Sequence, residues 1–201
     1  MTTTVDGGGK PLLRLNLGSG RRRVPGFVNV DNNPNAGDVD VIHDLDTLPW
    51  PFANDSVGEV VMDHVLEHLD DTIAVIQEVY RICADQAQVQ IRVPHLSCNW
   101  SHPGHRRAIG VGLFDHFDQR HDEHYGQCRF QVERLRLHWM RPRYRHSWWR
   151  RMFAAPIDWA ANRNPRLCQR LWCYWVGGFE EIEFHVRVVK DAAAPCAERE
   201  G

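Results

Sequence analysis

Three short apolar runs near the start of the chain each end in residues that suit nucleotide binding. The first run stops at Gly-Ser-Gly, 18–20, where a backbone with few side chains can approach a ligand closely. The second ends in Asp31, whose carboxylate can accept both hydroxyls of a ribose. The third is followed by Asp44, which can bind an exocyclic amine, and Leu45, which can cover a purine. If the runs are neighbouring parallel strands, these groups converge on one crevice.

Histidines gather in the middle of the chain, and three of them follow a fifth apolar run. His95, His102 and His105 are candidates for a general base, because an imidazole exchanges protons near neutral pH. The alternative is that each one is a hydrogen-bonded loop histidine. Both readings stay open at this point.

Metal and disulfide sites are not predicted. The six cysteines form no CxxC pair, which indicates reduced thiols rather than zinc ligands or a disulfide framework. His121 and His124 would share one face of a helix, as two metal ligands can, but no third ligand has matching spacing.

A basic and aromatic stretch at 141–153 is the second feature that could bind a ligand. We predict that Trp148, Arg150 and Arg151 contact an anionic acceptor, since guanidinium groups bind phosphate through paired hydrogen bonds. The stretch could also lie on an anionic membrane surface, or form a helix whose tryptophans pack on the sheet. A stable nucleic-acid complex is not expected, because the first 80 residues carry 13 acidic and only 5 basic side chains.

Local patterns predict an α/β fold that positions these groups. Apolar runs rather than strict alternation favour parallel strands covered on both faces. The connection between the first two strands is short for a crossover helix. The predicted strands are 12–17, 27–30, 39–42, 59–62, 89–93, 129–139 and 179–189, and the predicted helical segments are 72–82, 111–117 and 146–175.

The strings LNLGSGRRRVPGFVNVD, HDLDTLPWPFANDSVGEVVMDHVLEHL, EVYRIC and VQIRVPH, in that order over about 12–95, resemble class I S-adenosylmethionine-dependent methyltransferases of the small methyltransferase type 11-like group. The resemblance implies S-adenosylmethionine as cofactor. It also implies a Rossmann-like, seven-stranded, mostly parallel sheet with helices on both faces and one antiparallel strand near an edge.

The resemblance implies roles for particular residues. The glycine turn would lie against the methionine part of the cofactor, Asp31 would bind the ribose, Asp44 and Leu45 would border the adenine, and Asp63 and His64 would line the methyl-transfer pocket. The whole implied cofactor set is Asn16, Leu17, Gly18, Ser19, Gly20, Asp31, Asp44, Leu45, Asp63 and His64. Glu67 and His68 look like a structural pair. Arg23 stands where a dehydrogenase fingerprint needs its third glycine, which argues against that class.

The sequence therefore predicts a methyltransferase, with a sugar hydroxyl of a surface glycan or glycolipid, in polysaccharide biosynthesis, as acceptor. The alternatives are an RNA methyltransferase and a non-catalytic cofactor-binding protein with the same fold. The expected organisation is a leader at 1–10, one domain at 11–190 and a tail at 191–201. Within the domain, 11–95 would bind the cofactor, 96–178 would cap the acceptor side and 179–190 would form the last strand.

A location in the cytoplasm is expected, because the chain has no run of ~18 apolar residues and its start lacks a signal-peptide pattern. Peripheral contact with a membrane is compatible with the stretch at 141–153. The sequence leaves the oligomeric state open.

Overall fold

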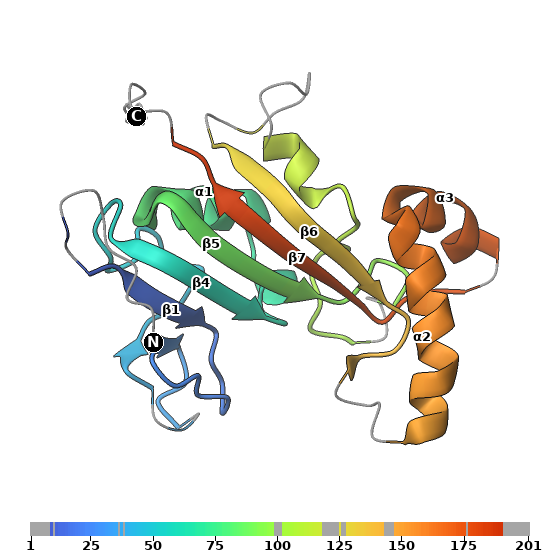
Figure 1. Cartoon of the computed structure of the whole chain (residues 1–201). Helices are drawn as coiled ribbons and strands as arrows, with labels where there is room; N and C mark the ends of the chain where they lie inside the picture. Colours follow the sequence, from blue (N-terminus) through green and yellow to red (C-terminus); the bar gives the residue numbers. More distant parts are fainter. Residues whose placement is uncertain are drawn as a thin grey trace.

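A computed structural model describes residues 9, 11–35, 37, 39–98, 102–117, 125, 128–142, 147–175 and 177–190. These residues form a seven-stranded sheet in the order β3-β2-β1-β4-β5-β7-β6 (Figure 1). The strands are β1 Leu13–Leu17, β2 Val28–Asp31, β3 Val41–Ile42, β4 Val57–Asp63, β5 Cys83–Val93, β6 Phe130–His138 and β7 Glu181–Val188. Strands β1 to β5 pair in parallel, whereas β7 is antiparallel to both of its neighbours. The predicted mostly parallel sheet with an antiparallel strand near one edge is confirmed.

Helix α1 (Thr72–Ile82) has the predicted bounds and packs its apolar face on the sheet. The Asp71 carboxylate caps the helix by accepting hydrogen bonds from the backbone amides of Ile73 and Ala74, both at 3.0 Å. The helix buries the side chains of Val75, Ile76, Val79 and Ile82. Together with apolar side chains of β1, β4, β5 and β7, they form the main core.

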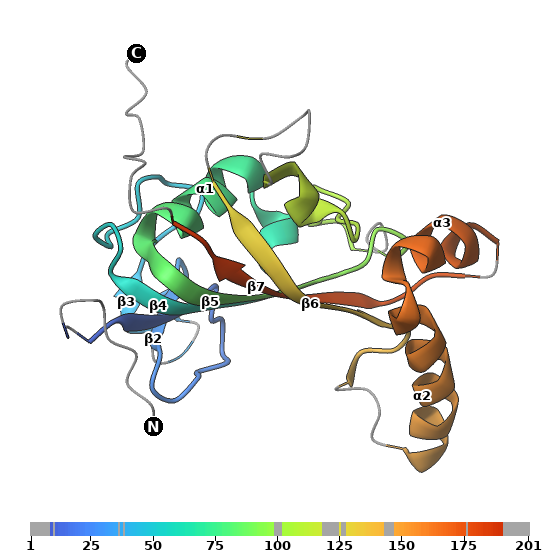
Figure 2. The ribbon, with the colours of Figure 1, turned by 45° about the horizontal axis from the view of Figure 1, so that its top comes forward.

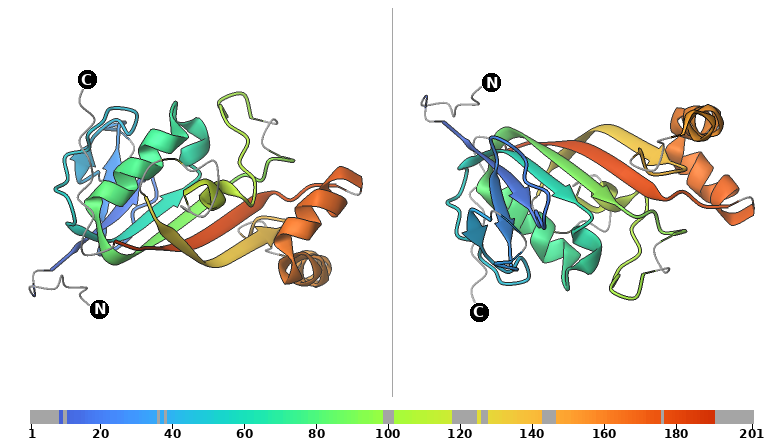
Figure 3. Two further views of the ribbon diagram at one scale, coloured as in Figure 1. Left: turned by 90° about the horizontal axis from the view of Figure 1, so that it is seen from above. Right: turned by 90° about the horizontal axis from the view of Figure 1, so that it is seen from below.

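The two faces of the sheet differ. Helices α1, η1 (Leu66–His68) and η3 (Leu113–Phe117) lie over one face (Figures 2 and 3). On the other face, the described residues place no helix over β1, β4 and β5, so the helices expected on both faces are not seen there. The connections at 18–27 and 32–40 are short and rich in Gly, Pro and Asn, which leaves no room for a crossover helix.

Polar side chains occupy this second face. Arg14 pairs with Glu59 at 2.7 Å, and Arg92 pairs with Glu183 at 3.1 Å. Buried and more exposed residues alternate along β4, β5 and β7, as expected for strands with one wet face. The sheet is therefore stabilised by apolar packing on one side and by ion pairs on the other.

Helices α2 (Trp148–Arg163) and α3 (Pro165–Trp175) project from the far end of the sheet (Figure 1). The Asn162 amide anchors α2 to β6, because it donates to the Leu137 carbonyl and accepts from the Leu137 amide, both at 2.8 Å. The aromatic side chains face solvent: Trp148, Trp159 and Trp175 are 73%, 65% and 84% exposed. The alternative in which the tryptophans of 141–153 pack on the sheet is wrong, since Trp148 and Trp149 are exposed and α2 meets β6 through its C-terminal half.

Some predicted features differ in extent or lie outside the described residues. Strand β5 begins at Cys83, six residues before its predicted start, and contains an irregularity where Gln86 has a φ of 63°. The predicted leader, apart from Gly9, and the predicted tail lie outside the described residues, as do His121 and His124. The five cysteines that are described are free thiols. No helix among the described residues is long and apolar enough to cross a membrane.

Candidate active site

A tight turn follows β1 and forms one wall of the site. Gly18 and Gly20 have φ values of 66° and 50°, a backbone region that is strained for residues with a side chain. A Cβ on Gly18 would overlap the side chain of Val65. The Gly20 amide donates to the Asp31 carboxylate at 2.7 Å, and the Ser19 amide donates to the Val30 carbonyl at 3.0 Å. The tip of β2 thus holds the turn that follows β1.

The buried Asn16 fixes the chain just beyond this turn. Its side-chain amide donates to the Arg22 carbonyl and to the Asn29 side-chain carbonyl, both at 2.9 Å. The Arg22 guanidinium pairs with the Asp63 carboxylate at the end of β4. Residues 18–22 are therefore held between the tips of β2 and β4.

A cavity of about 510 Å³ opens at this edge of the sheet, where the chain order of the strands reverses between β1 and β4. Its volume lies within the roughly 300–1,000 Å³ typical of small-molecule sites, and such a reversal is where open α/β sheets bind ligands. The cavity is lined by Asn16, Gly18, Ser19, Gly20, Arg22, Asp63, His64, Glu67, His68, His102, His105 and Arg141.

His64 sits in the cavity wall between two buried carboxylates. Its backbone has a φ of 58°, which is uncommon for a residue with a side chain. Its Nδ1 lies 3.2 Å from Glu67 Oε1, and its Nε2 lies 2.9 Å from Glu181 Oε2. Burial lowers the pKa of His64, but hydrogen bonds to Glu181 and Glu67 outweigh it, so the pKa is raised. The two carboxylates thus favour the protonated form of the ring, whose charge offsets negative charge buried in the cavity wall.

The ionic contacts continue from the cavity to the polar face of the sheet. Burial opposes ionisation of Glu181, but the neighbouring His64, His138 and Arg92 lower its pKa. Burial likewise disfavours a charge on His138, yet interactions with Asp158 and Glu183 raise its pKa to about 9. His138 Nε2 lies 3.1 Å from Glu183 Oε2. Buried histidines and carboxylates therefore alternate from the cavity to β6.

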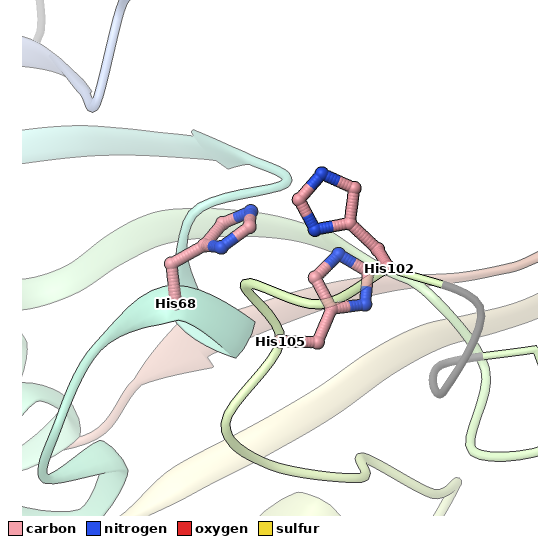
Figure 4. Close-up of side chains that lie close together, drawn as sticks. All are labelled: His68, His102 and His105. Atoms are coloured by element: carbon pink, nitrogen blue, oxygen red, sulfur yellow. The ribbon is translucent and has the colours of Figure 1, made fainter.

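Three further histidines of the cavity lining converge near Glu67. His68 lies at the end of η1, whereas His102 and His105 lie in the loop after β5, and their rings point toward one another (Figure 4). The His102 and His105 rings are stacked with centroids 4.6 Å apart, and His68 meets them edge-on at 5.5 and 4.9 Å. We call these three residues the histidine cluster.

The structure brings six of the ten implied cofactor residues to the cavity lining: Asn16, Gly18, Ser19, Gly20, Asp63 and His64. Leu17 is fully buried in β1, and Asp31 reaches the site through Gly20. The Asp44 carboxylate is exposed and accepts from the Asp46 amide, whereas Leu45 is buried in the core. Neither Asp44 nor Leu45 lines the cavity.

The three candidate bases separate into two groups. His102 and His105 line the cavity, but His95 does not, and its side chain is fully buried between Ser97 and Gln169. Burial lowers the pKa of His95 to about 4, so the ring is neutral. His95 therefore fits the alternative of a hydrogen-bonded histidine.

The predicted acceptor residues Trp148, Arg150 and Arg151 lie on α2 and do not line the cavity. Sequence reasoning gave no ligand role to Arg22, Glu67 or His68, and included Arg141 only as the first residue of the stretch 141–153; all four line the cavity. Arg22 stands within three consecutive arginines just after the glycine turn, and that proximity is the one signal that could have identified it.

Comparisons with known proteins agree on the fold. No protein-family model and no curated protein matches the chain. Among solved structures, an S-adenosylmethionine-dependent methyltransferase from Mesorhizobium loti is 12% identical, with a TM-score of 0.53 over 88% of this chain and 90% of that chain. One from Archaeoglobus fulgidus is 13% identical, with a TM-score of 0.53 over 88% and 86%. The cyclase SpnF is 12% identical, with a TM-score of 0.55 over 90% and 76%.

The protein thus has the Rossmann-like fold of class I S-adenosylmethionine-dependent methyltransferases. Because structures of this fold include a cyclase as well as methyltransferases, the fold alone does not define the reaction. The function is therefore inferred from the residues that line the cavity.

Proposed function

We propose that the protein is an S-adenosylmethionine-dependent methyltransferase. The observation that carries this proposal is the glycine turn, held by Asp31, beside a cavity at the switch point between β1 and β4. Gly20 leaves open space beside the backbone, Gly18 makes room for the side chain of Val65, and the buried Ser19 hydroxyl has no hydrogen-bond partner among the described residues. These features fit a cofactor with a polar end and a ribose.

The cofactor supplies a methyl group on a sulfonium, which is already a strong electrophile. The protein then has to bind, orient and exclude water. Asp31 accepts the ribose hydroxyls, since its carboxylate has lone pairs beyond those used by Gly20 and Asn33. Arg22 lines the cavity, and its guanidinium, which already pairs with Asp63, has further N–H donors for the carboxylate of the methionine part. Asp44 remains our proposal for an adenine contact, whereas Leu45 can border the adenine only from its place in the core.

The acceptor proposed is a hydroxyl of an anionic sugar, as in a surface glycan or glycolipid. Arg141 lines the same cavity and offers a cation to such an acceptor. The histidine cluster lies beside it, where an unprotonated imidazole nitrogen can take the proton of a hydroxyl. The proposed activating group is therefore His102 or His105 together with His68, and not His95.

We also propose that the protein meets a lipid-linked acceptor through α2. Trp148 and Trp149 are each followed four residues later by an exposed apolar side chain, Met152 or Phe153, so these side chains form an apolar stripe on the helix. Arg150 and Arg151 stand beside that stripe. Exposed tryptophans next to arginines are typical of helices that lie on anionic bilayers.

Calorimetry with S-adenosylhomocysteine tests the proposed cofactor. We expect one molecule to bind per chain, and no binding at millimolar concentration would overturn the proposed function. A screen with radiolabelled S-adenosylmethionine then compares nucleotide sugars, lipid-linked glycans and RNA as methyl acceptors. Methyl uptake by RNA alone, falling steeply with salt, would support the RNA alternative. Binding without uptake by any acceptor would support the non-catalytic alternative.

A further inference from the structure

We propose that the histidine cluster, His68, His102 and His105, is a binding site for one divalent transition-metal ion of the zinc type. This inference goes beyond the proposed function, because metal binding is measured without cofactor or acceptor. A ring nitrogen that binds the ion is not available as a base, so the base role proposed above belongs to the metal-free cluster. The sequence predicted no metal site, since His68 stands far along the chain from the other two histidines and its spacing gives no ligand motif.

The first argument is the convergence of the three rings. Each histidine offers one ring nitrogen, and these three nitrogens all lie within 4.8 Å of one another (Figure 4). Nitrogens bound to one tetrahedral zinc ion lie about 3.3 Å apart, given Zn–N distances near 2.0–2.1 Å. Zinc binding therefore requires the rings to move closer together, and His102, the most exposed of the three residues, is the one expected to turn.

Gly104 supports two of the rings. Its carbonyl accepts from His68 Nδ1 at 2.9 Å, which leaves His68 Nε2 unprotonated. Histidine ligands commonly donate their second ring nitrogen to a backbone carbonyl in this way. The Gly104 amide donates to His102 Nδ1 at 3.1 Å, and this bond would be given up as the ring turns. A Cβ on Gly104 would lie 3.1 Å from His102, so a larger residue would push that ring.

Glu67 supplies an independent observation. Its side chain is fully buried and lines the cavity, and Oε1 lies 4.0 Å from His105 Nε2. The other oxygen, Oε2, has no hydrogen-bond partner among the described residues. A buried carboxylate oxygen without a partner is costly, and a nearby cation would offset that cost. The carboxylate therefore favours a positive charge at the cluster.

A second group in the cavity, Asp63, His64 and Glu181, has similar spacing but is already neutralised. Both ring nitrogens of His64 contact carboxylates, and Asp63 pairs with Arg22. The histidine cluster, by contrast, consists of imidazole rings that contact one another, with the buried Glu67 carboxylate beside His105. Three imidazoles favour zinc, cobalt, nickel or copper over magnesium.

The test is titration of the metal-free, full-length protein with Zn²⁺ by calorimetry and with Co²⁺ by visible absorption. We expect one ion per chain, a cobalt spectrum of tetrahedral or five-coordinate type, and no comparable binding of Mg²⁺. His102→Ala should weaken Zn²⁺ binding at least about 100-fold, and His68→Ala should do the same. The matched control is His43→Ala, which changes a histidine outside the cluster and should leave the affinity unchanged.

Unchanged Zn²⁺ affinity in His102→Ala would overturn the proposal, because binding would then come from other histidines. His102 is exposed in a loop, so this variant is expected to fold even if His68→Ala does not. S-adenosylhomocysteine binding is measured on the same samples. Loss of metal binding with retained S-adenosylhomocysteine binding separates this inference from the proposed function.

Discussion

Two hollows of similar size differ in the side chains that line them. The cavity beside the glycine turn measures about 510 Å³ and is lined mainly by polar and charged side chains. The groove between α2 and α3 measures about 520 Å³ and is lined mainly by apolar side chains, including Leu167, Leu171, Trp172 and Phe179. We call it the apolar groove.

The difference lies in which groups are removed from water. At the cavity, Glu67 and Glu181 are buried, and one oxygen of each contacts the half-buried His64 ring, an arrangement that suits a preorganised reaction site. Along α2 and α3 the apolar side chains are the exposed groups, which suits adhesion to another surface. The proposed reaction site and the proposed docking surface therefore lie on separate parts of one small domain.

The largest effect expected is from breaking the buried ion pair in the cavity wall. Glu181→Ala should lower the free energy of unfolding by about 3 kcal/mol, because His64 Nε2 loses its buried hydrogen-bond partner. Denaturant unfolding measures the change. The control is Glu133→Ala, which breaks a partly exposed pair with Arg187 and should cost about 1 kcal/mol or less. Equal effects would contradict the special role of burial.

Stability should also fall at alkaline pH. His138 has a pKa of about 9 in the folded protein and near 6.5 when unfolded. Its contribution is therefore complete below pH 6.5 and is lost as the pH rises through about 9, a loss of up to about 3 kcal/mol. Unfolding measured at pH 6.5 and 9.5 should show this drop, and His138→Gln should reduce it. His43→Gln, outside the network, should leave the pH slope as it is.

The next prediction concerns a substitution that should weaken cofactor binding and leave membrane binding unchanged. Asp31→Ala should weaken S-adenosylhomocysteine binding by about 1–3 kcal/mol, because a charged acceptor is lost from the glycine turn. Calorimetry measures this change, and vesicle binding should stay the same. An unchanged affinity would remove Asp31 from the site.

The smallest effect is expected on membrane binding by α2, with cofactor binding unchanged. Replacing Arg150 and Arg151 by Ala should weaken binding to phosphatidylglycerol vesicles by about 1 kcal/mol per arginine, and the effect should shrink as salt rises. Vesicle co-sedimentation measures the change, with S-adenosylhomocysteine affinity as the control. If both affinities fell together, α2 would be a structural part of the cavity rather than a separate surface.

The sequence predicted the sheet well because its signals are local. The apolar runs placed all seven strands, and the spacing of Val75, Ile76, Val79 and Ile82 gave helix α1. It overestimated helical cover on the second face, because apolar runs as short as those at 12–17 and 59–62 do not distinguish a strand with one polar face from one with two apolar faces.

The positions of the glycine turn and of Asp31 at the tip of β2 could be predicted from the chain alone, since each follows from an apolar run and the residues that end it. The hydrogen bond from the Gly20 amide to Asp31, 11 residues away, was not predicted. Two contacts could be seen only in the tertiary structure: His64 faces Glu181, 117 residues away, and His68 lies beside His102 and His105. The physical reason is that such contacts arise from how strands and loops meet in space. No pattern along the chain predicts these contacts.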